Sequence, residues 1–307
     1  MFKDSINNFL KDKSILILGF GREGRSTLNY IIKNKVKYSK LAIADKNVNI
    51  DKEYEFVEYF LGDNYLDCIN QFDVIIKAPG ISLKNIDLKR INAEITSQAE
   101  LFLKFGKEKV IGVTGTKGKS TTTTMIYNIL STKYKVEIVG NIGIPVLNFV
   151  DNFEETDYFV YEFSSHQLEL IDASPKIAVF LNLYQDHLDY YSSFEAYANA
   201  KRNIYMHQTA DDILIYNLDM EVKLFGKYLP ISKRVGISQN EVMNNTININ
   251  GNILSLSDLN LSGNHNKYNF IVACTIARML NVEDEKIIEG IKGFKSLPHR
   301  LEKIRRI

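Results

Sequence analysis

Residues 112–124, GVTGTKGKSTTTT, combine glycines, lysines and five consecutive hydroxyl side chains, which are poor material for a hydrophobic core. Gly118, Lys119 and Ser120 have the types and order that end a phosphate-binding loop. In such a loop the backbone N–H groups face the phosphates, the lysine contacts the outer ones, and the hydroxyl ligates Mg²⁺. The usual spacing puts a glycine five residues before Gly118, where this chain has Val113, so the loop is a variant. The alternative is a glycine turn with an incidental lysine.

A second glycine-rich turn, GFGREG at residues 19–24, follows a short apolar run and precedes a helical pattern. Asp45 lies about 20 residues further on, which is the position of the ribose-binding carboxylate in a dinucleotide site. The glycines could equally do no more than permit a tight turn. In either case, the helix start favours an anionic group such as a diphosphate.

The elements that must position these turns alternate along the chain. Near-continuous apolar runs predict strands at 14–18, 41–45, 73–80, 109–113, 158–163, 177–183 and 212–218. Helical segments separate them, including an amphipathic one at 95–106, and Asn-Gly-Asn within 246–256 predicts a hairpin. Strands of this kind form parallel sheets covered on both faces, so the fold class is α/β. We expect a Rossmann-like domain over 1–107 and a P-loop ATPase-like domain over 108–307.

Composition narrows the class of protein. The chain has 307 residues, 45% of them hydrophobic and 24% charged, with a formal net charge of +1. This near-zero balance argues against nucleic-acid and membrane-surface partners. Cys68 and Cys274 have no metal-ligand spacing and predict reduced thiols. No 18-residue apolar run or signal-like N-terminus occurs, so we expect a cytoplasmic protein.

The phosphate loop and five further stretches together resemble the Mur ligase family of ATP-dependent amide ligases, in the order of its D-glutamate-adding branch. They are TGTKGKS, GNIGIP (140–145), YEFSSHQLE (161–169), NLYQDHLDYYSSFEAYANAKRNIY (182–205), SGNHNKYN (262–269) and LPHRLE (297–302). The resemblance implies a UDP-sugar-binding first domain and an ATP-binding central domain. It also implies that a third, amino-acid-binding domain is absent, so we expect this chain to bind substrates with little turnover.

The resemblance also implies site residues. For ATP they are Gly115, Thr116, Lys117, Gly118, Lys119, Ser120, Thr121, Asn269 and Arg300. For Mg²⁺ they are Ser120, Glu162, His187 and Lys201, the last as a carbamate. Lys119, His187 and Lys201 are the implied catalytic residues. For UDP-N-acetylmuramoyl-L-alanine they are Gly21, Arg22, Glu23, Asp45, Lys46, Gly80, Asn141 and His187. D-Glutamate is the second substrate, and a monomer is expected.

Three of these residues have a simpler explanation. Glu162 could be a strand-end carboxylate facing solvent, and a lone histidine such as His187 is more often a hydrogen-bonded structural residue. Lys201 could be an ordinary solvated helix lysine. The carbamate is chemically plausible because burial lowers an amine pKa, and a neutral amine takes up CO₂.

Other functions compete with this one. The 19–24 turn with Asp45 also suggests a nicotinamide-dependent dehydrogenase, which leaves the second loop, Glu162 and Lys201 without a role. A non-catalytic nucleotide-binding module is the second alternative. The folylpolyglutamate synthetase branch shares the loop but lacks an N-terminal uridine-binding domain, whereas residues 1–107 precede the loop here.

Overall fold

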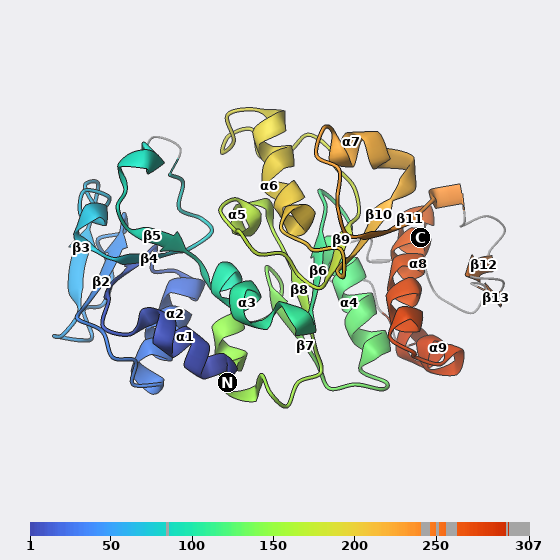
Figure 1. Cartoon of the computed structure of the whole chain (residues 1–307), viewed down its shortest axis with the longest axis horizontal. Coiled ribbons are helices and arrows are strands. Elements are labelled where there is room, and N and C mark those ends of the chain that lie inside the picture. The colour runs from blue at the N-terminus through green and yellow to red at the C-terminus, as the bar shows by residue number, and fades with distance from the viewer. Residues whose placement is uncertain (84–85, 241–245, 250–251, 256–262, 293, 295–307) are drawn as a thin grey trace, which may run out of the picture.

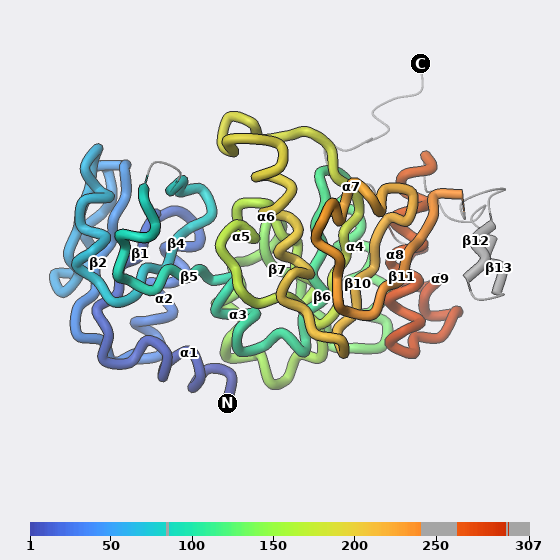
Figure 2. Tube along the Cα trace, turned by 45° about the horizontal axis from the view of Figure 1, so that its top comes forward, coloured from blue at the N-terminus to red at the C-terminus, as the bar shows by residue number. Residues whose placement is uncertain are grey.

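A computed structural model describes residues 1–83, 86–240, 246–249, 252–255, 263–292 and 294. It contains two parallel sheets that lie side by side along the long axis of the molecule, with α3 between them (Figure 1). The N-terminus lies at the lower edge of the molecule, below α3 (Figure 2). Within the described residues, no helix is both long and apolar enough to cross a membrane.

The first sheet has five parallel strands in the order β3-β2-β1-β4-β5. They are β1 (Ser14–Leu18), β2 (Lys40–Asp45), β3 (Glu58–Leu61), β4 (Val74–Lys77) and β5 (Glu94–Thr96). Its helices are α1 (Phe2–Leu10), α2 (Arg22–Lys33) and α3 (Gln98–Gly106). Because the strand order reverses between β1 and β4, the crevice for a ligand lies at their carboxyl ends, beside the 19–24 turn.

The second sheet has six parallel strands in the order β11-β10-β9-β6-β8-β7. They are β6 (Val110–Thr114), β7 (Val136–Gly140), β8 (Tyr158–Glu162), β9 (Ile177–Phe180), β10 (Ile213–Asn217) and β11 (Lys233–Ile237). Its helices are α4 (Lys119–Leu130), α5 (Ser165–Leu168), α6 (Phe194–Met206), α7 (Glu221–Phe225), α8 (Asn264–Met279) and α9 (Asp284–Lys292). The predicted hairpin is present as antiparallel β12 (Thr246–Ile249) and β13 (Asn252–Ser255).

Successive side chains of a strand point to opposite faces of the second sheet, so each face packs against its own layer of helices. Val110 and Phe159 belong to the core that includes α3 and α6, whereas their neighbours Ile111 and Val160 belong to the core with α4, α8 and α9. Both faces of the second sheet are therefore buried, which explains why its strands read as continuous apolar runs.

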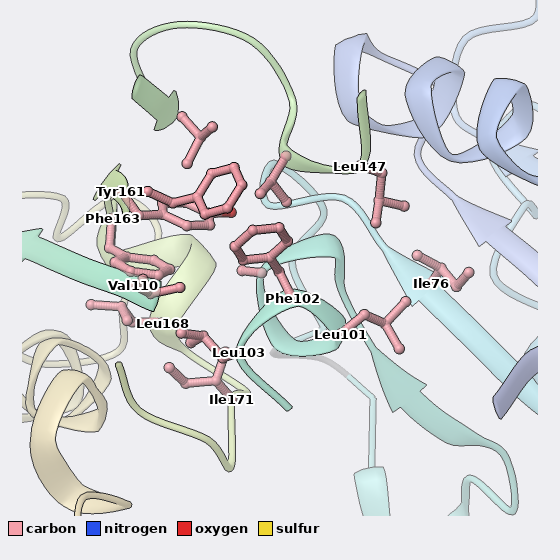
Figure 3. Packing of buried hydrophobic residues seen from close by; sticks show 14 of the residues in the cluster. Ile76, Leu101, Phe102, Leu103, Val110, Leu147, Tyr161, Phe163, Leu168 and Ile171 are labelled. Atoms are coloured by element: carbon pink, nitrogen blue, oxygen red, sulfur yellow. The ribbon is translucent and has the colours of Figure 1, made fainter. Parts of the chain in front are cut away.

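A single hydrophobic core joins the two sheets. Figure 3 shows Leu101 and Phe102 of α3 between Ile76 of the first sheet and Tyr161 of the second. Phe153 extends this core, because its ring stacks on Phe2 of α1 with centroids 3.7 Å apart. The predicted helix at 95–106 is shorter than expected, since Glu94–Thr96 forms the edge strand β5 and the helix begins only after the Ser97 cap.

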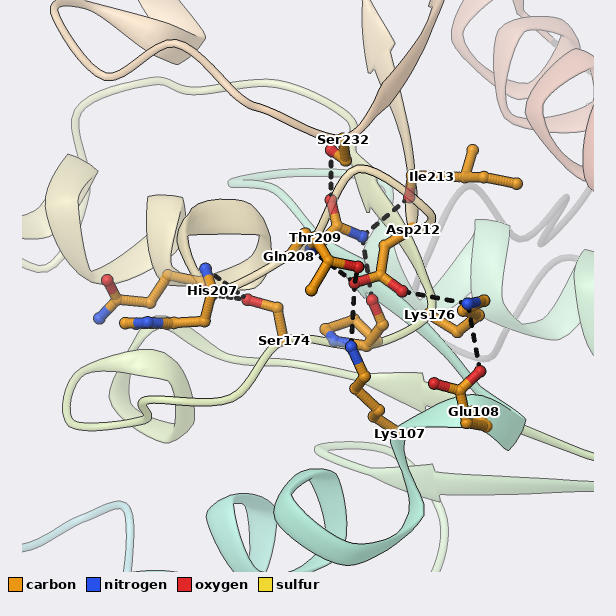
Figure 4. A network of polar contacts seen from close by, with 12 residues as sticks. Lys107, Glu108, Ser174, Lys176, His207, Gln208, Thr209, Asp212, Ile213 and Ser232 are labelled. Atoms are coloured by element: carbon orange, nitrogen blue, oxygen red, sulfur yellow. Dashed lines mark hydrogen bonds and ion pairs between the residues drawn. The ribbon is translucent and has the colours of Figure 1, made fainter.

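A buried polar network fixes the amino ends of three central strands (Figure 4). The Asp212 carboxylate is fully buried before β10, and it lies 3.0 Å from the Lys107 amine before β6 and 3.3 Å from the Lys176 amine before β9. Burial alone would raise the pKa of Asp212, but hydrogen bonds from Thr209 and Lys107 lower it overall. The carboxylate therefore stays charged and holds these strand ends together.

Candidate active site

The phosphate loop has the geometry that its sequence predicted. β6 ends at Thr114, and Gly118 precedes α4 with a left-handed φ of 84°. A Cβ atom at Gly118 would lie 3.1 Å from the Asn269 side-chain oxygen, so α8 packs directly against the loop. The predicted base-side residue Asn269 is thus buried beside the predicted phosphate loop, although about 150 residues separate them in the chain.

Side chains hold the loop backbone in place. Asn182 lies two residues after β9. Its side-chain amide accepts from the backbone N–H groups of Thr116 (3.0 Å) and Lys117 (2.9 Å) and donates to the Lys117 carbonyl. Lys119 folds back and donates to the Gly115 and Thr116 carbonyls at 3.0 and 3.1 Å. Asn182 was missed as a site residue, although it is the first residue of the 182–205 stretch, because it also lies within the predicted strand 177–183 and its contacts with the loop depend on the fold.

Ser120 Oγ and Glu162 Oε2 are among the buried side-chain oxygen atoms that have no hydrogen-bond partner among the described residues. Ser120 opens α4, and Glu162 ends β8, where it pairs in register with Val113 of β6. A buried carboxylate oxygen with no partner is costly unless a cation contacts it. The pair fits Mg²⁺, which takes oxygen ligands and keeps several waters.

Lys201 of α6 is buried beside the loop, with 2% of its surface exposed. Its amine donates to the Gly115 carbonyl at 2.9 Å and lies 5.0 Å from the centre of the Tyr197 ring. Burial and then the neighbouring Lys119 charge lower the pKa of Lys201 far below its usual value, against the opposing effect of Asp186 and Glu162. The environment therefore favours the neutral amine, and the ordinary solvated lysine is excluded.

His187 lies in the segment between β9 and α6. Its side chain is about half exposed (47%), and its ring stands 5.2 Å from His166 and 6.0 Å from Tyr197. The described residues contain no group of three or more His, Cys, Asp or Glu side chains that could hold a metal ion. Ser120 and Lys201, two of the four predicted ligands, are not of these residue types, so the predicted metal set stays a prediction.

A cavity of about 370 Å³ opens between the two domains. Both parts of the chain line it: Gly19, Gly21, Arg22, Glu23, Asp45, Ala78, Pro79, Gly80, Ile81, Asn141, Ser164 and Gln167. Most of the residues predicted to bind the UDP-sugar are among them. Lys46 and His187 are not, and Lys46 is exposed, with its amine 3.9 Å from the Asp63 carboxylate. The predicted residue Arg300 lies outside the described residues.

Asp45 shapes the first glycine turn. One carboxylate oxygen accepts from the Phe20 N–H at 2.6 Å, and the other accepts from the Asn47 N–H at 2.7 Å. These two bonds fix the end of β2 against the 19–24 turn. The Asp45 carboxylate therefore positions the backbone that lines this part of the cavity.

Asn141 connects the cavity with the candidate metal ligand. It lines the cavity, and its side-chain amide donates to Glu162 Oε1 at 2.8 Å, while its backbone N–H donates to the Glu162 carbonyl at 3.0 Å. Glu162 thus has one oxygen held by Asn141 and the other free to take a cation. A substrate in the cavity would lie next to the residue that positions this carboxylate.

Comparison with protein families agrees with this geometry. Residues 113–277 match the model of the Mur ligase middle domain, and residues 13–97 match that of the Mur ligase MurD-like N-terminal domain. The chain belongs to the Mur ligase family. The dehydrogenase and the non-catalytic module have no support in these matches.

Relatives within the Mur ligase family cover most of the chain. It is similar to the UDP-N-acetylmuramoylalanine–D-glutamate ligase of Clostridium acetobutylicum, with 33% identity over 97% of this chain and 69% of the relative. Among solved structures it resembles MurF from Acinetobacter baumannii (17% identity, TM-score 0.55, covering 98% of this chain and 64% of that one). It also resembles the MurF ligase from Thermotoga maritima in complex with ADP (17% identity, TM-score 0.52, covering 95% and 65%). At this identity the two structures support the fold alone.

Proposed function

We propose that the chain carries the ATP-dependent ligase chemistry of peptidoglycan precursor synthesis and joins D-glutamate to UDP-N-acetylmuramoyl-L-alanine. The observation that supports the proposal is the Asn141–Glu162 contact, because Asn141 lines the interdomain cavity and Glu162 pairs with Val113 of the strand that leads into the loop. The relative from Clostridium acetobutylicum, named for D-glutamate addition, supports the choice of amino acid.

The residues divide the work as follows. The nucleotide-sugar occupies the interdomain cavity with its diphosphate near the start of α2 and its alanine carboxylate near Asn141. Lys119 and the loop N–H groups bind the ATP phosphates, and Asn269 approaches the base. ATP then phosphorylates the carboxylate and leaves as ADP, and the neutral amine of D-glutamate attacks the acyl phosphate, so that an amide bond forms and inorganic phosphate and a proton leave. Positioning and charge neutralisation supply most of the rate in such a transfer.

Ser120 and Glu162 would hold Mg²⁺, and Lys201 would reach it as a carbamate. Bound there, the cation would neutralise the charge of the ATP phosphates. Burial lowers the pKa of Lys201 and so raises the share of the neutral amine, which is the form that reacts with CO₂. We expect a carbamate signal after labelling with ¹³C-bicarbonate, and its absence from Lys201→Met. The same spectrum in both proteins would contradict the assignment.

The direct test is binding. UDP-N-acetylmuramoyl-L-alanine at millimolar concentration should raise the melting temperature and shift backbone resonances of the 19–24 turn and of Asn141. UDP-N-acetylmuramate without the alanine should bind more weakly. If neither compound changes the protein, the proposed function is wrong.

A second test supplies ATP, Mg²⁺ and the nucleotide-sugar with single amino acids and follows product by chromatography. D-Glutamate should be the preferred acceptor, and preference for another amino acid would reassign the chain within its family. We further propose domains over 1–107 and 108–307 and a monomer acting in the cytoplasm. Light scattering after gel filtration tests the monomer.

A further inference from the structure

Two adjacent residues of the first glycine turn reach across the domain boundary. Arg22 is the first residue of α2, and its guanidinium donates to the carbonyls of Gly143 (3.2 Å), Gly140 (3.4 Å) and Asn141 (3.5 Å). Glu23, the next residue, accepts from the Gln167 side-chain amide of α5 at 2.9 Å. The two contacts end on opposite sides of β8, one on the turn after β7 and one on the helix after β8.

The turn that Arg22 contacts packs closely against Glu162. Gly140 and Gly143 have φ values of 98° and 86°, which other residues rarely adopt. A Cβ atom at Gly140 would lie 2.5 Å from the Glu162 carbonyl oxygen, and one at Gly143 would lie 2.7 Å from the Ile138 carbonyl. Within this turn, Asn141 donates two hydrogen bonds to Glu162, one from its side chain and one from its backbone. A shift of the turn must therefore move the Glu162 carboxylate.

Glu23 makes a comparable contact with the residues that follow Glu162. Gln167, which donates to Glu23, also accepts from the Ser164 N–H at 3.1 Å and so completes the cap of α5 directly after Glu162. Burial raises the pKa of Glu23, although the hydrogen bond from Gln167 opposes the shift. Arg22 and Glu23 thus hold the backbone on both sides of the carboxylate, and both line the cavity.

We propose that Arg22 and Glu23 are positioning residues that couple the nucleotide-sugar cavity to the metal-binding carboxylate Glu162 through Asn141 and Gln167. The inference rests on the proposed function for the identity of the cavity ligand. We further infer that a ligand in the cavity and Mg²⁺ with ATP strengthen each other's binding, since both stabilise the same arrangement of Arg22, Glu23 and the backbone next to Glu162. Arg22 then acts on the cation site without touching it.

The test measures the Mg²⁺ concentration that gives half-maximal binding of a non-hydrolysable ATP analogue, with no nucleotide-sugar present. Arg22→Ala should raise this midpoint about 3- to 10-fold, and the melting temperature shows whether the variant is folded. Arg25→Ala is the matched control: Arg25 is an exposed arginine one turn further along α2, beside the Phe20 ring of its own domain, and its removal should leave the midpoint unchanged. An unchanged midpoint in Arg22→Ala would overturn the proposal, because a mere ligand of the nucleotide-sugar has no effect in this assay.

A double-mutant cycle tests whether Arg22 acts on the Mg²⁺ site through Asn141. If Arg22 acts through Asn141, then Arg22→Ala should have no further effect on the Mg²⁺ midpoint of Asn141→Ala, whereas additive effects would contradict the route. Adding UDP-N-acetylmuramoyl-L-alanine should tighten analogue binding at least 5-fold in the wild type and less than 2-fold in Arg22→Ala. If the wild type does not bind this compound, the proposed function fails, while the comparison without nucleotide-sugar still decides the role of Arg22.

Discussion

At the scale of single residues, Lys119 offers the most direct test of the predicted phosphate loop. Its amine donates to the Gly115 and Thr116 carbonyls. We propose that it contacts the outer phosphates of a bound nucleotide. Lys119→Ala should weaken binding of an ATP analogue with Mg²⁺ by about 2–4 kcal/mol, because a charge-assisted contact to phosphate is lost. Calorimetry measures the loss, and Lys135→Ala, an exposed lysine at the far end of β7 paired with Glu155, should bind normally. Equal affinity in Lys119→Ala would contradict the loop assignment.

Glu100 gives a prediction about pH. Burial and the adjacent Asp172 carboxyl raise the pKa of Glu100 from 4.5 to about 8. Between these values the folded chain holds a proton that the unfolded chain has lost, so the unfolding free energy falls as pH rises from about 4.5 to 8. Glu100→Gln should reduce this fall by about 1–2 kcal/mol, after allowance for solvent screening.

Urea denaturation at pH 5 and pH 8 checks the Glu100 prediction. Glu55→Gln, a change at an exposed carboxylate, should keep the wild-type difference between the two pH values. The same difference in Glu100→Gln would show that the buried carboxyl does not titrate as described.

Much of the candidate site could be predicted at this scale. The sequence placed Ser120, Glu162 and Lys201 in motifs, and the structure buries all three near the phosphate loop or its neighbouring strands. The contacts of Arg22, Asn182 and Gln167 could not be predicted, because they depend on how loops far apart in the chain meet. Lys46 does not line the cavity although it directly follows Asp45, and the roles predicted for His187 and Lys46 stay predictions.

At the scale of helices and strands, Gly290 sets how closely α9 approaches α4. A Cβ atom there would lie 2.6 Å from the Ile129 Cα and 2.8 Å from the Asn128 carbonyl oxygen. Gly290→Ala should therefore destabilise the fold by about 1–3 kcal/mol in spite of the better helix propensity of alanine. Gly80→Ala, where a Cβ meets no atom within 4 Å, serves as the control for stability. Urea denaturation measures both, and a gain of stability in Gly290→Ala would contradict the packing.

The element pattern of the chain could largely be predicted where strands are buried on both faces. The apolar runs at 14–18 and 158–163 match β1 and β8 within one residue. The missed strands are short or lie at or near sheet edges: β3, β5, β7 and β11. β11, for example, lies at a sheet edge and begins with the exposed residues Lys233 and Arg234, which interrupt the apolar pattern.

At the scale of the whole molecule, the shared core predicts that both sheets unfold together. Phe153 contacts Phe2 of α1 and Phe159 of β8, with ring centroids 3.7 and 5.4 Å apart. Phe153→Ala should cost about 3–5 kcal/mol and should lower the stability of both sheets at once. Phe56→Ala, at an exposed ring, should cost far less.

Hydrogen exchange followed by mass spectrometry at rising urea concentration checks this prediction. Peptides covering β1 and β6 should lose protection in one transition, in the wild type and in Phe153→Ala. Two separate transitions would show that the aromatic core does not join the domains energetically.

The Arg22 contact also has an evolutionary consequence. Arg22 binds main-chain oxygens of the 140–143 turn, so it constrains the path of that backbone and not its side chains. Sequence drift in this family should therefore be tolerated at Ile142, whereas purifying selection should act on Gly140 and Gly143, whose left-handed geometry presents those oxygens. In a saturation library selected for growth, variants of Ile142 should survive and variants of either glycine should be lost.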